Sequence, residues 1–167
     1  LCRIGTDGRL YLHTGVGNLG TYSYAAVVRT AAEVLKVEWE NCEIVRGNTD
    51  LHLPYSTYQA GSNTMFTEVR TNYVAAMDAL RKLKAIAAAE LGGEPDDYDI
   101  DGERVFLVSN PDQNITYAQA AQRAVEMGGE YSGQEFPDNL NDVTKRSVQG
   151  LAGTGLIGVA KDGRHTG

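Results

Sequence analysis

The sequence LYLHTGVGNLGTYSYAAVVRTAA, residues 10–32, decides the fold, because an apolar strand breaks into glycines and then restarts at helical spacing. The glycines of the break are Gly15, Gly17 and Gly20. They permit positive backbone dihedrals and a close approach of the main chain to a ligand. Thr21 or Ser23 is a candidate cap for the following helix, whose first-turn amides point outward. These amides and the positive end of the helix dipole predict a site for phosphate or another anion; the alternative is a turn that binds nothing.

Short strands and turns are predicted around this strand–turn–helix unit. Residues 9–14 have the pattern of a strand, and the turn at residues 6–8 suits a hairpin or a return from an earlier strand. Residues 42–46 form another short strand, which ends in a turn at residues 47–50. Residues 51–60 follow neither a helical nor a strand period, so they are predicted to form a loop, long enough to suggest a function.

The longest predicted element is a helix over about residues 62–91, which two glycines terminate. Apolar residues recur along it in steps of three and four, so this helix is expected to be the central packing element. These residues are Met65, Val69, Tyr73, Ala76, Leu80, Leu83, Ala87 and Leu91. Glu68, like Glu33 and Glu38, is interpreted as a solvated residue.

The second half of the chain is predicted to contain a hairpin over residues 98–108 and a helix over residues 117–127, capped by Thr116. Residues 130–167 are predicted to be an irregular tail, with one last strand at residues 156–160. The elements together predict an α+β fold, in which a mixed sheet of short strands packs against two or three helices, one of them long.

Length and composition fit one globular domain over all 167 residues, and the start at a residue other than methionine suggests a piece of a longer chain. The net charge of −7 and the absence of a basic patch argue against binding nucleic acid or an anionic membrane. No apolar run is long enough to span a bilayer. Cys2 and Cys42 are expected to be free thiols in a reducing cytoplasm. The histidines His13, His52 and His165 do not cluster, so no metal site is expected from this chain alone.

The order of several segments resembles a known family. The segments are DGRLYLHTGVGNLGTYSYAAVVRTAAEVLKV, EIVRGNTDLHLP, QAGSNTMFTEVRTNYVAAMDALRKLKAIAAAELGG, DGERVF and ITYAQAAQRA. They are similar to the molybdopterin-binding large subunit of the molybdenum hydroxylases, which include xanthine dehydrogenase, aldehyde oxidase and the aerobic carbon monoxide dehydrogenases. The likeness covers residues 7–129, which is most of this chain but only part of a large subunit. It therefore implies a fragment or a split subunit of a molybdopterin-binding domain.

The resemblance assigns cofactor contacts to two segments. The Gly-Gln-Gly turn of the family falls on residues 20–22, with Thr21 in place of the glutamine and Tyr22 in place of the second glycine. The segment at residues 60–64 stands where the family offers amides and hydroxyls to the pterin phosphate. The residues implied to bind the cofactor are Gly17, Asn18, Gly20, Thr21, Tyr22, Gly61, Ser62, Asn63 and Thr64. Helix capping alone is the alternative role for Ser62 and Thr64.

The resemblance further implies a molybdenum–molybdopterin cofactor, with or without a dinucleotide extension. Iron–sulfur clusters and FAD are expected only on partner chains, and the partners are other portions or subunits of the enzyme and a small-molecule substrate. The family's general base is a glutamate in a context that this chain lacks, so no catalytic residue is assigned. Two alternatives stay open: a non-catalytic structural subunit that has lost cofactor contact, and a free-standing phosphate- or nucleotide-binding module.

Overall fold

The computed structural model describes residues 1–160. Its larger sheet has four strands in the order β3-β2-β1-β7, with β2 and β3 parallel and the other two pairs antiparallel. Its smaller sheet is an antiparallel meander in the order β4-β5-β6. The strands of the larger sheet are β1 (Cys2–Gly5), β2 (Leu10–His13), β3 (Cys42–Val45) and β7 (Gly155–Gly158). Those of the smaller sheet are β4 (Tyr98–Asp101), β5 (Arg104–Leu107) and β6 (Asn110–Thr116).

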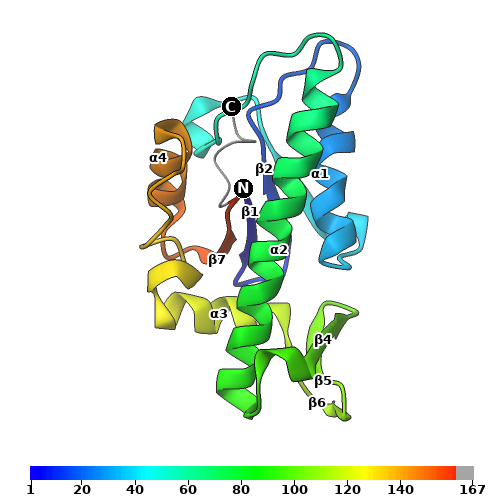
Figure 1. Ribbon diagram of the computed structural model, residues 1–167, viewed down its shortest axis with the longest axis vertical. Coiled ribbons are helices and arrows are strands. Elements are labelled where there is room, and N and C mark those ends of the chain that lie inside the picture. The colour runs from blue at the N-terminus through cyan, green and yellow to red at the C-terminus, as the bar shows by residue number, and fades with distance from the viewer. Residues whose placement is uncertain (161–167) are drawn as a thin grey trace.

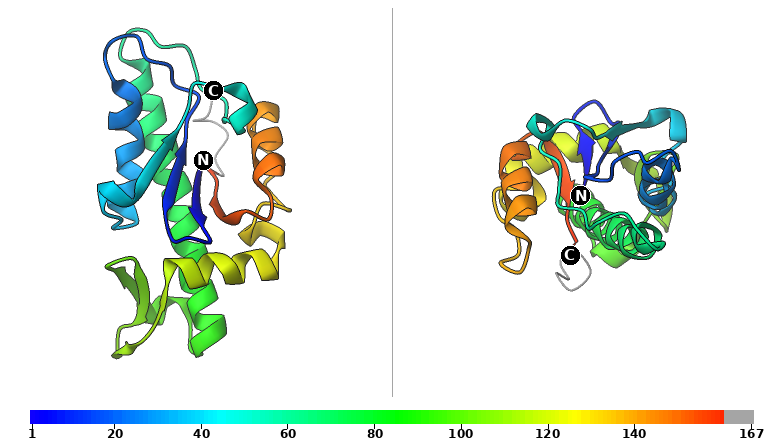
Figure 2. Two further views of the ribbon diagram at one scale, coloured as in Figure 1. Left: turned by 180° about the vertical axis from the view of Figure 1, so that it is seen from behind. Right: turned by 90° about the horizontal axis from the view of Figure 1, so that it is seen from above.

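Helices cover both faces of the larger sheet (Figures 1 and 2). They are α1 (Ser23–Val34), α2 (Asn63–Leu91), α3 (Tyr117–Met127) and α4 (Asp142–Leu151). The views show α1 and α2 side by side on one face and α4 on the other, while α3 and the smaller sheet lie toward the C-terminal end of α2. The predicted α+β fold with one long helix is confirmed.

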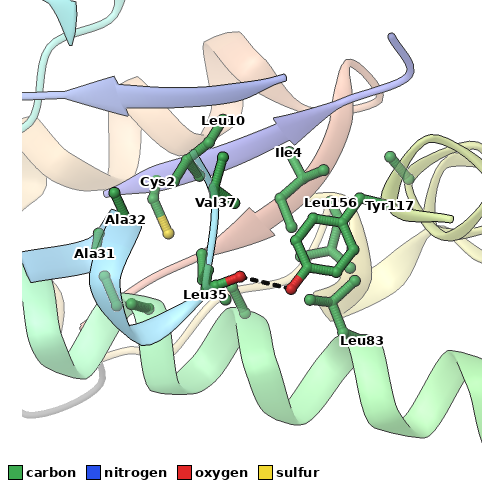
Figure 3. Close-up of a cluster of buried hydrophobic side chains, with 14 of the residues drawn as sticks. Cys2, Ile4, Leu10, Ala31, Ala32, Leu35, Val37, Leu83, Tyr117 and Leu156 are labelled. Atoms are coloured by element: carbon green, nitrogen blue, oxygen red, sulfur yellow. Dashed lines mark hydrogen bonds between the residues drawn. The ribbon is translucent and has the colours of Figure 1, made fainter. Parts of the chain in front are cut away.

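The main core lies between the larger sheet and the pair α1 and α2, where apolar side chains from all three meet (Figure 3). Tyr117, the first residue of α3, is buried there, and its hydroxyl donates a 2.7 Å hydrogen bond to the carbonyl of Leu35. Burial raises the pKa of Tyr117, so the hydroxyl stays protonated and can keep this bond. A second apolar cluster, between α4 and the opposite face of the sheet, includes Val148, Leu151 and Ile157.

Two side chains of α2 form hydrogen bonds with the backbone at and just after β7, on the edge of the sheet that has no neighbouring strand within residues 1–160. Asp78 and Lys82, each with a side chain only 3% exposed, form a 2.8 Å ion pair. Lys82 donates a 2.6 Å hydrogen bond to the carbonyl of Ile157, and Asp78 accepts one of 3.1 Å from the amide of Val159. Because buried backbone groups need partners, this pair replaces a further strand at the sheet edge.

The expected apolar face of α2 is buried or half-buried at Val69 and from Ala76 to Ala87, but members near both ends are exposed, including Leu91 at 36%. Met65 and Tyr73 are 44% and 49% exposed, whereas Thr64, Glu68 and Asn72 are buried. The predicted solvated position of Glu68 is therefore wrong. The reason is tertiary packing. The N-terminal half of α2 packs against the irregular loop of residues 52–62, and Glu68 accepts a hydrogen bond from the loop backbone at Thr57.

Two elements were not expected from the sequence. Residues 130–160, expected to be irregular apart from one strand, contain helix α4, which begins at the side-chain cap of Asn141. Polar residues of α4 are buried against the loop of residues 52–62, so its inward face carries too few apolar residues to predict a helix. The polar segment Asn110–Thr116 forms strand β6, because β5 supplies its backbone partners.

Candidate functional site

Two loops meet at the end of the molecule where both α1 and α2 begin (Figures 1 and 2). We call residues 14–22 the first loop and residues 52–62 the second loop. The carboxamide of Gln59 forms two hydrogen bonds with Gly17: it accepts from the amide at 2.9 Å and donates to the carbonyl at 3.0 Å. A Cβ atom at Gly15 would lie 2.6 Å from the carbonyl oxygen of Pro54, so the two loops also pack tightly. The predicted glycine segments are thus neighbours.

Both helices begin at a residue with left-handed backbone geometry. The φ angle is 53° at Tyr22 before α1 and 63° at Ser62 before α2. Neither helix has a side-chain cap, so the candidate caps Thr21 and Ser23 do not act as caps, and Ser62 does not take its alternative role of capping α2. The amides of Ala25 and Asn63 already donate to the carbonyls of Tyr22 and Ala60. The other first-turn amides are the donors that the two starts offer to an anion: those of Ser23 and Tyr24 in α1 and of Thr64 and Met65 in α2.

The predicted residues of the first loop are exposed. The side chain of Asn18 accepts a 2.9 Å hydrogen bond from the amide of Gly20, and Thr21 contacts the hydroxyl of Ser23 at 3.3 Å. Nothing lies within 4 Å of a Cβ atom placed on Gly20, and Tyr22 is 64% exposed. These side chains therefore do not bury the start of α1.

The four predicted residues of the second loop and of the start of α2 differ in orientation. Gly61 and Ser62 are exposed, and nothing lies within 4 Å of a Cβ atom placed on Gly61. Asn63 donates to the hydroxyl of Thr57 at 2.6 Å, so its amide group supports the loop. Thr64 is buried, with an exposed fraction of 8%.

Sequence reasoning missed the residues that hold the second loop. Its backbone is anchored at alternate positions by side chains from two helices. The hydroxyl of Ser147 donates to the carbonyl of Leu53 at 2.5 Å, and the hydroxyl of Thr144 accepts from the amide of Tyr55 at 3.2 Å. Glu68 accepts a hydrogen bond from the backbone of Thr57, and burial raises the pKa of its carboxyl. Isolated polar residues on α4 carry no sequence signal of this role.

His13 lies at the end of β2, directly before the first loop, and is 3% exposed. Neither ring nitrogen has a hydrogen-bond partner of good geometry within residues 1–160. Burial, reinforced by the nearby charge of Arg3, lowers the pKa of His13 to about 3. The imidazole is therefore neutral at neutral pH, and it lines a cavity of about 20 Å³ that Glu68 and Asn72 also line.

The remaining metal-binding residue types are dispersed. Burial raises the pKa of Cys2 and of Cys42 to about 11, so both are thiols at neutral pH, and both are free cysteines. His165 lies outside the described residues. Within residues 1–160, no three histidine, cysteine, aspartate or glutamate side chains gather in a geometry that could hold a metal ion. No helix in the same range is both long and apolar enough to cross a membrane.

The fold and the site define an α+β domain with two adjacent, uncapped helix starts facing the same end. Residues 1–157 match the family described as "Molybdopterin cofactor-binding domain". The chain belongs to this family, and the resemblance to the molybdenum hydroxylases is confirmed.

Solved structures of related enzymes are similar in fold to this chain. The Cu,Mo-CO dehydrogenase in its carbon monoxide reduced state is 25% identical, with a TM-score of 0.63 over 74% of this chain and 15% of that chain. The reconstituted CO dehydrogenase from Oligotropha carboxidovorans gives 25% identity and a TM-score of 0.64 over the same shares. Quinoline 2-oxidoreductase from Pseudomonas putida 86 shares the fold, at 21% identity and a TM-score of 0.59 over 71% of this chain and 15% of its own. Each solved relative is thus matched over only 15% of its length. No curated protein sequence gives a significant match.

The residues at the two helix starts fit the phosphate of a molybdopterin. Phosphate binding needs several N–H donors and open space before them. The two first turns have no side-chain cap, and a Cβ atom on Gly20 or Gly61 would meet nothing within 4 Å. The donor set is made of backbone amides with an exposed hydroxyl at Ser62, and it contains no side chain suited to bind molybdenum directly.

Proposed function

We propose that this chain supplies part of the cofactor-binding surface of a molybdenum hydroxylase, and that further polypeptide supplies the rest of the enzyme. The observation that carries the proposal is the pair of uncapped helix starts, at Tyr22 and Ser62, which follow two loops joined by the Gln59–Gly17 hydrogen bonds in a member of this family. When bound, the cofactor would supply the two-electron chemistry that hydroxylates an aldehyde or N-heteroaromatic carbon with water as the oxygen source.

In this proposal the chain's own residues bind and orient. The amides of Ser23 and Tyr24 and those of Thr64 and Met65 hold the phosphate, and the hydroxyl of Ser62 adds a further donor. Gly20 and Gly61 keep the approach free of side chains, while Asn18 stabilises the turn before α1. Gly17 and Asn63 act only by shaping the loops, because the amide of Gly17 donates to Gln59 and that of Asn63 donates to the carbonyl of Ala60. Thr21 and Thr64 would contribute through their backbone amides. No residue of this chain is assigned a catalytic role.

The partners in this proposal follow from the share of the relatives that the chain matches. Because this chain is matched to 15% of the length of each solved relative, further polypeptide would have to supply the substrate pocket, and the isolated chain is expected to be inactive. Iron–sulfur clusters and FAD would lie on partner chains. The form of the pterin, with or without a dinucleotide, and a cytoplasmic location belong to the same proposal.

The test introduces a carboxylate at the proposed phosphate site. Ser62→Asp places a negative charge at the start of α2, where it competes with phosphate but does not oppose the helix dipole. Ser62→Asn is the matched neutral control, and asparagine also tolerates left-handed geometry. In the complex purified with its natural partner chains, the aspartate variant should lose at least tenfold of its molybdenum and pterin, while the asparagine variant keeps them. Equal cofactor content in both variants would refute the phosphate site.

The second candidate function is a structural subunit that has lost contact with the cofactor. Tyr22 favours it, because a tyrosine stands where the family has a glycine that lets the cofactor approach. This alternative predicts that the complex carries its molybdenum on a catalytic partner chain and that Ser62→Asp leaves the molybdenum content unchanged. The molybdenum content of the Ser62→Asp complex therefore separates the two functions.

A further inference from the structure

Gln59 makes the contact that joins the two loops of the site. Its carboxamide pairs with both the amide and the carbonyl of Gly17, at 2.9 and 3.0 Å, although the residues are 42 positions apart. This two-bond arrangement resembles one rung of a β-ladder and fixes the direction as well as the position of the peptide unit. Other side-chain hydrogen bonds described for residues 15–22 are local: those of Val16 and Gly20 stay within the first loop, and that of Thr21 reaches Ser23 at the start of α1.

The loop that carries Gln59 is itself held in place. Its anchors reach it from α4 on one side and from α2 on the other. These anchors are the contacts of Ser147 with Leu53, of Thr144 with Tyr55, and of Asn63 and Glu68 with Thr57. Alternate residues up to Thr57 are thus fixed, and Gln59 is the next in this series. A side chain mounted on an immobile backbone can position what it binds.

Gln59 also lies directly before the residues that open α2. Only Ala60 and Gly61 separate it from Ser62, and the amide of Asn63 donates back to the carbonyl of Ala60 at 2.9 Å. On the other side, Gly17 precedes Tyr22, where α1 begins, by five residues that include the turn closed by Asn18. The connections from the Gln59–Gly17 contact to the two helix starts are therefore short on both sides.

We propose that Gln59 is a positioning residue for cofactor binding, which fixes the first loop against the second and thereby sets the spacing of the helix starts at Tyr22 and Ser62. This inference rests on the proposed function, because the spacing matters only if both helix starts bind one phosphate. The oxygen and one N–H of its carboxamide are engaged by Gly17. Its removal should therefore weaken anion binding by releasing the first loop from the second, while every backbone donor at the two helix starts remains.

The test compares Gln59→Met, which keeps the length of the side chain but has no carboxamide, with Gln113→Met. Gln113 is an exposed residue of β6, in the small sheet near the opposite end of α2 (Figure 1). Amide hydrogen exchange is measured over residues 15–22 of the full chain. Inorganic phosphate is titrated against the backbone amide signals of Gly20 and Gly61, and the unfolding midpoint in urea is recorded.

The expected result is that Gln59→Met speeds exchange at Gly17 and Gly20 at least tenfold and weakens phosphate binding about tenfold, while its unfolding midpoint equals that of Gln113→Met. Wild-type exchange and wild-type phosphate affinity in Gln59→Met would overturn the positioning role. A loss of affinity that comes with a lowered midpoint and faster exchange throughout the chain would also overturn it. If the wild-type chain shifts neither glycine signal in phosphate and its complex holds no molybdenum, the proposed function itself fails.

Discussion

Buried His13 should make the domain lose stability in mild acid. Its pKa is lowered to about 3 in the folded protein, mainly by burial, while a histidine in the unfolded chain titrates near its ordinary value of about 6.5. Below pH 6.5 the imidazole of His13 therefore binds a proton in the unfolded state but stays neutral in the folded state. The resulting loss of stability begins near pH 6.5 and continues until the pH falls to the folded value.

The size of the effect follows from the two pKa values. For one group with these values, proton linkage lowers the free energy of unfolding by about 2 kcal/mol between pH 7 and pH 5. Glu68 lines the same cavity and acts in the opposite sense, because its pKa is raised and the folded state takes up its proton first. Comparison with a variant that changes only His13 removes the contribution of Glu68 to first order.

The assay is urea unfolding of the wild type and of His13→Gln at pH 7 and at pH 5. The wild type should lose about 2 kcal/mol more than the variant between the two pH values, whatever the stability of the variant at pH 7. A difference below about 0.5 kcal/mol would refute the argument, since it would mean that the folded protein accepts a proton on His13 near the ordinary pKa.

Three further outcomes are expected from buried groups. Glu68→Gln keeps an acceptor for the loop but cannot ionise. In thermal unfolding, its stability relative to that of the wild type should therefore rise as the pH increases above the ordinary carboxyl pKa, and a constant stability difference across pH would contradict the raised pKa of Glu68. Asp78→Leu leaves Lys82 buried without its partner and should cost about 3–5 kcal/mol in urea unfolding, whereas a loss below about 1 kcal/mol would exclude a dry ion pair. Adding Lys82→Met should recover only part of the loss, because the carbonyl of Ile157 and the amide of Val159 then lack their side-chain partners. Gly158→Ala brings a methyl group against the carbonyl oxygen of Ala75 and should cost about 1–3 kcal/mol by calorimetry, whereas an unchanged melting temperature would show that β7 can shift away from α2.

Local sequence patterns located most of the elements. The helix predicted over residues 117–127 is α3, with Thr116 as its observed cap, and the helix predicted over residues 62–91 differs from α2 by one residue. Apolar periodicity, capping residues and paired glycines act over a few neighbouring positions, so they can be read directly from the chain. The turn that joins β1 to β2 was located in the same way.

The site was only partly predictable for the same reason. Glycine segments near Gly17 and Gly61 were recognisable, because they interrupt regular elements and resemble the family. Gln59, Thr144 and Ser147 were not, since their partners lie 42, 89 and 94 positions away. A single polar residue has no periodicity, so only the folded chain shows which backbone group it satisfies.

By itself, the sequence determined the α+β class, the order of most helices and strands, the two glycine loops and the family. Tertiary structure alone decided that α4 supports the second loop, that Glu68 and His13 are buried, and that both helix starts lack side-chain caps. The physical reason is that hydrophobic periodicity and turn propensity are local, whereas irregular backbone needs hydrogen-bond partners that can come from any part of the chain.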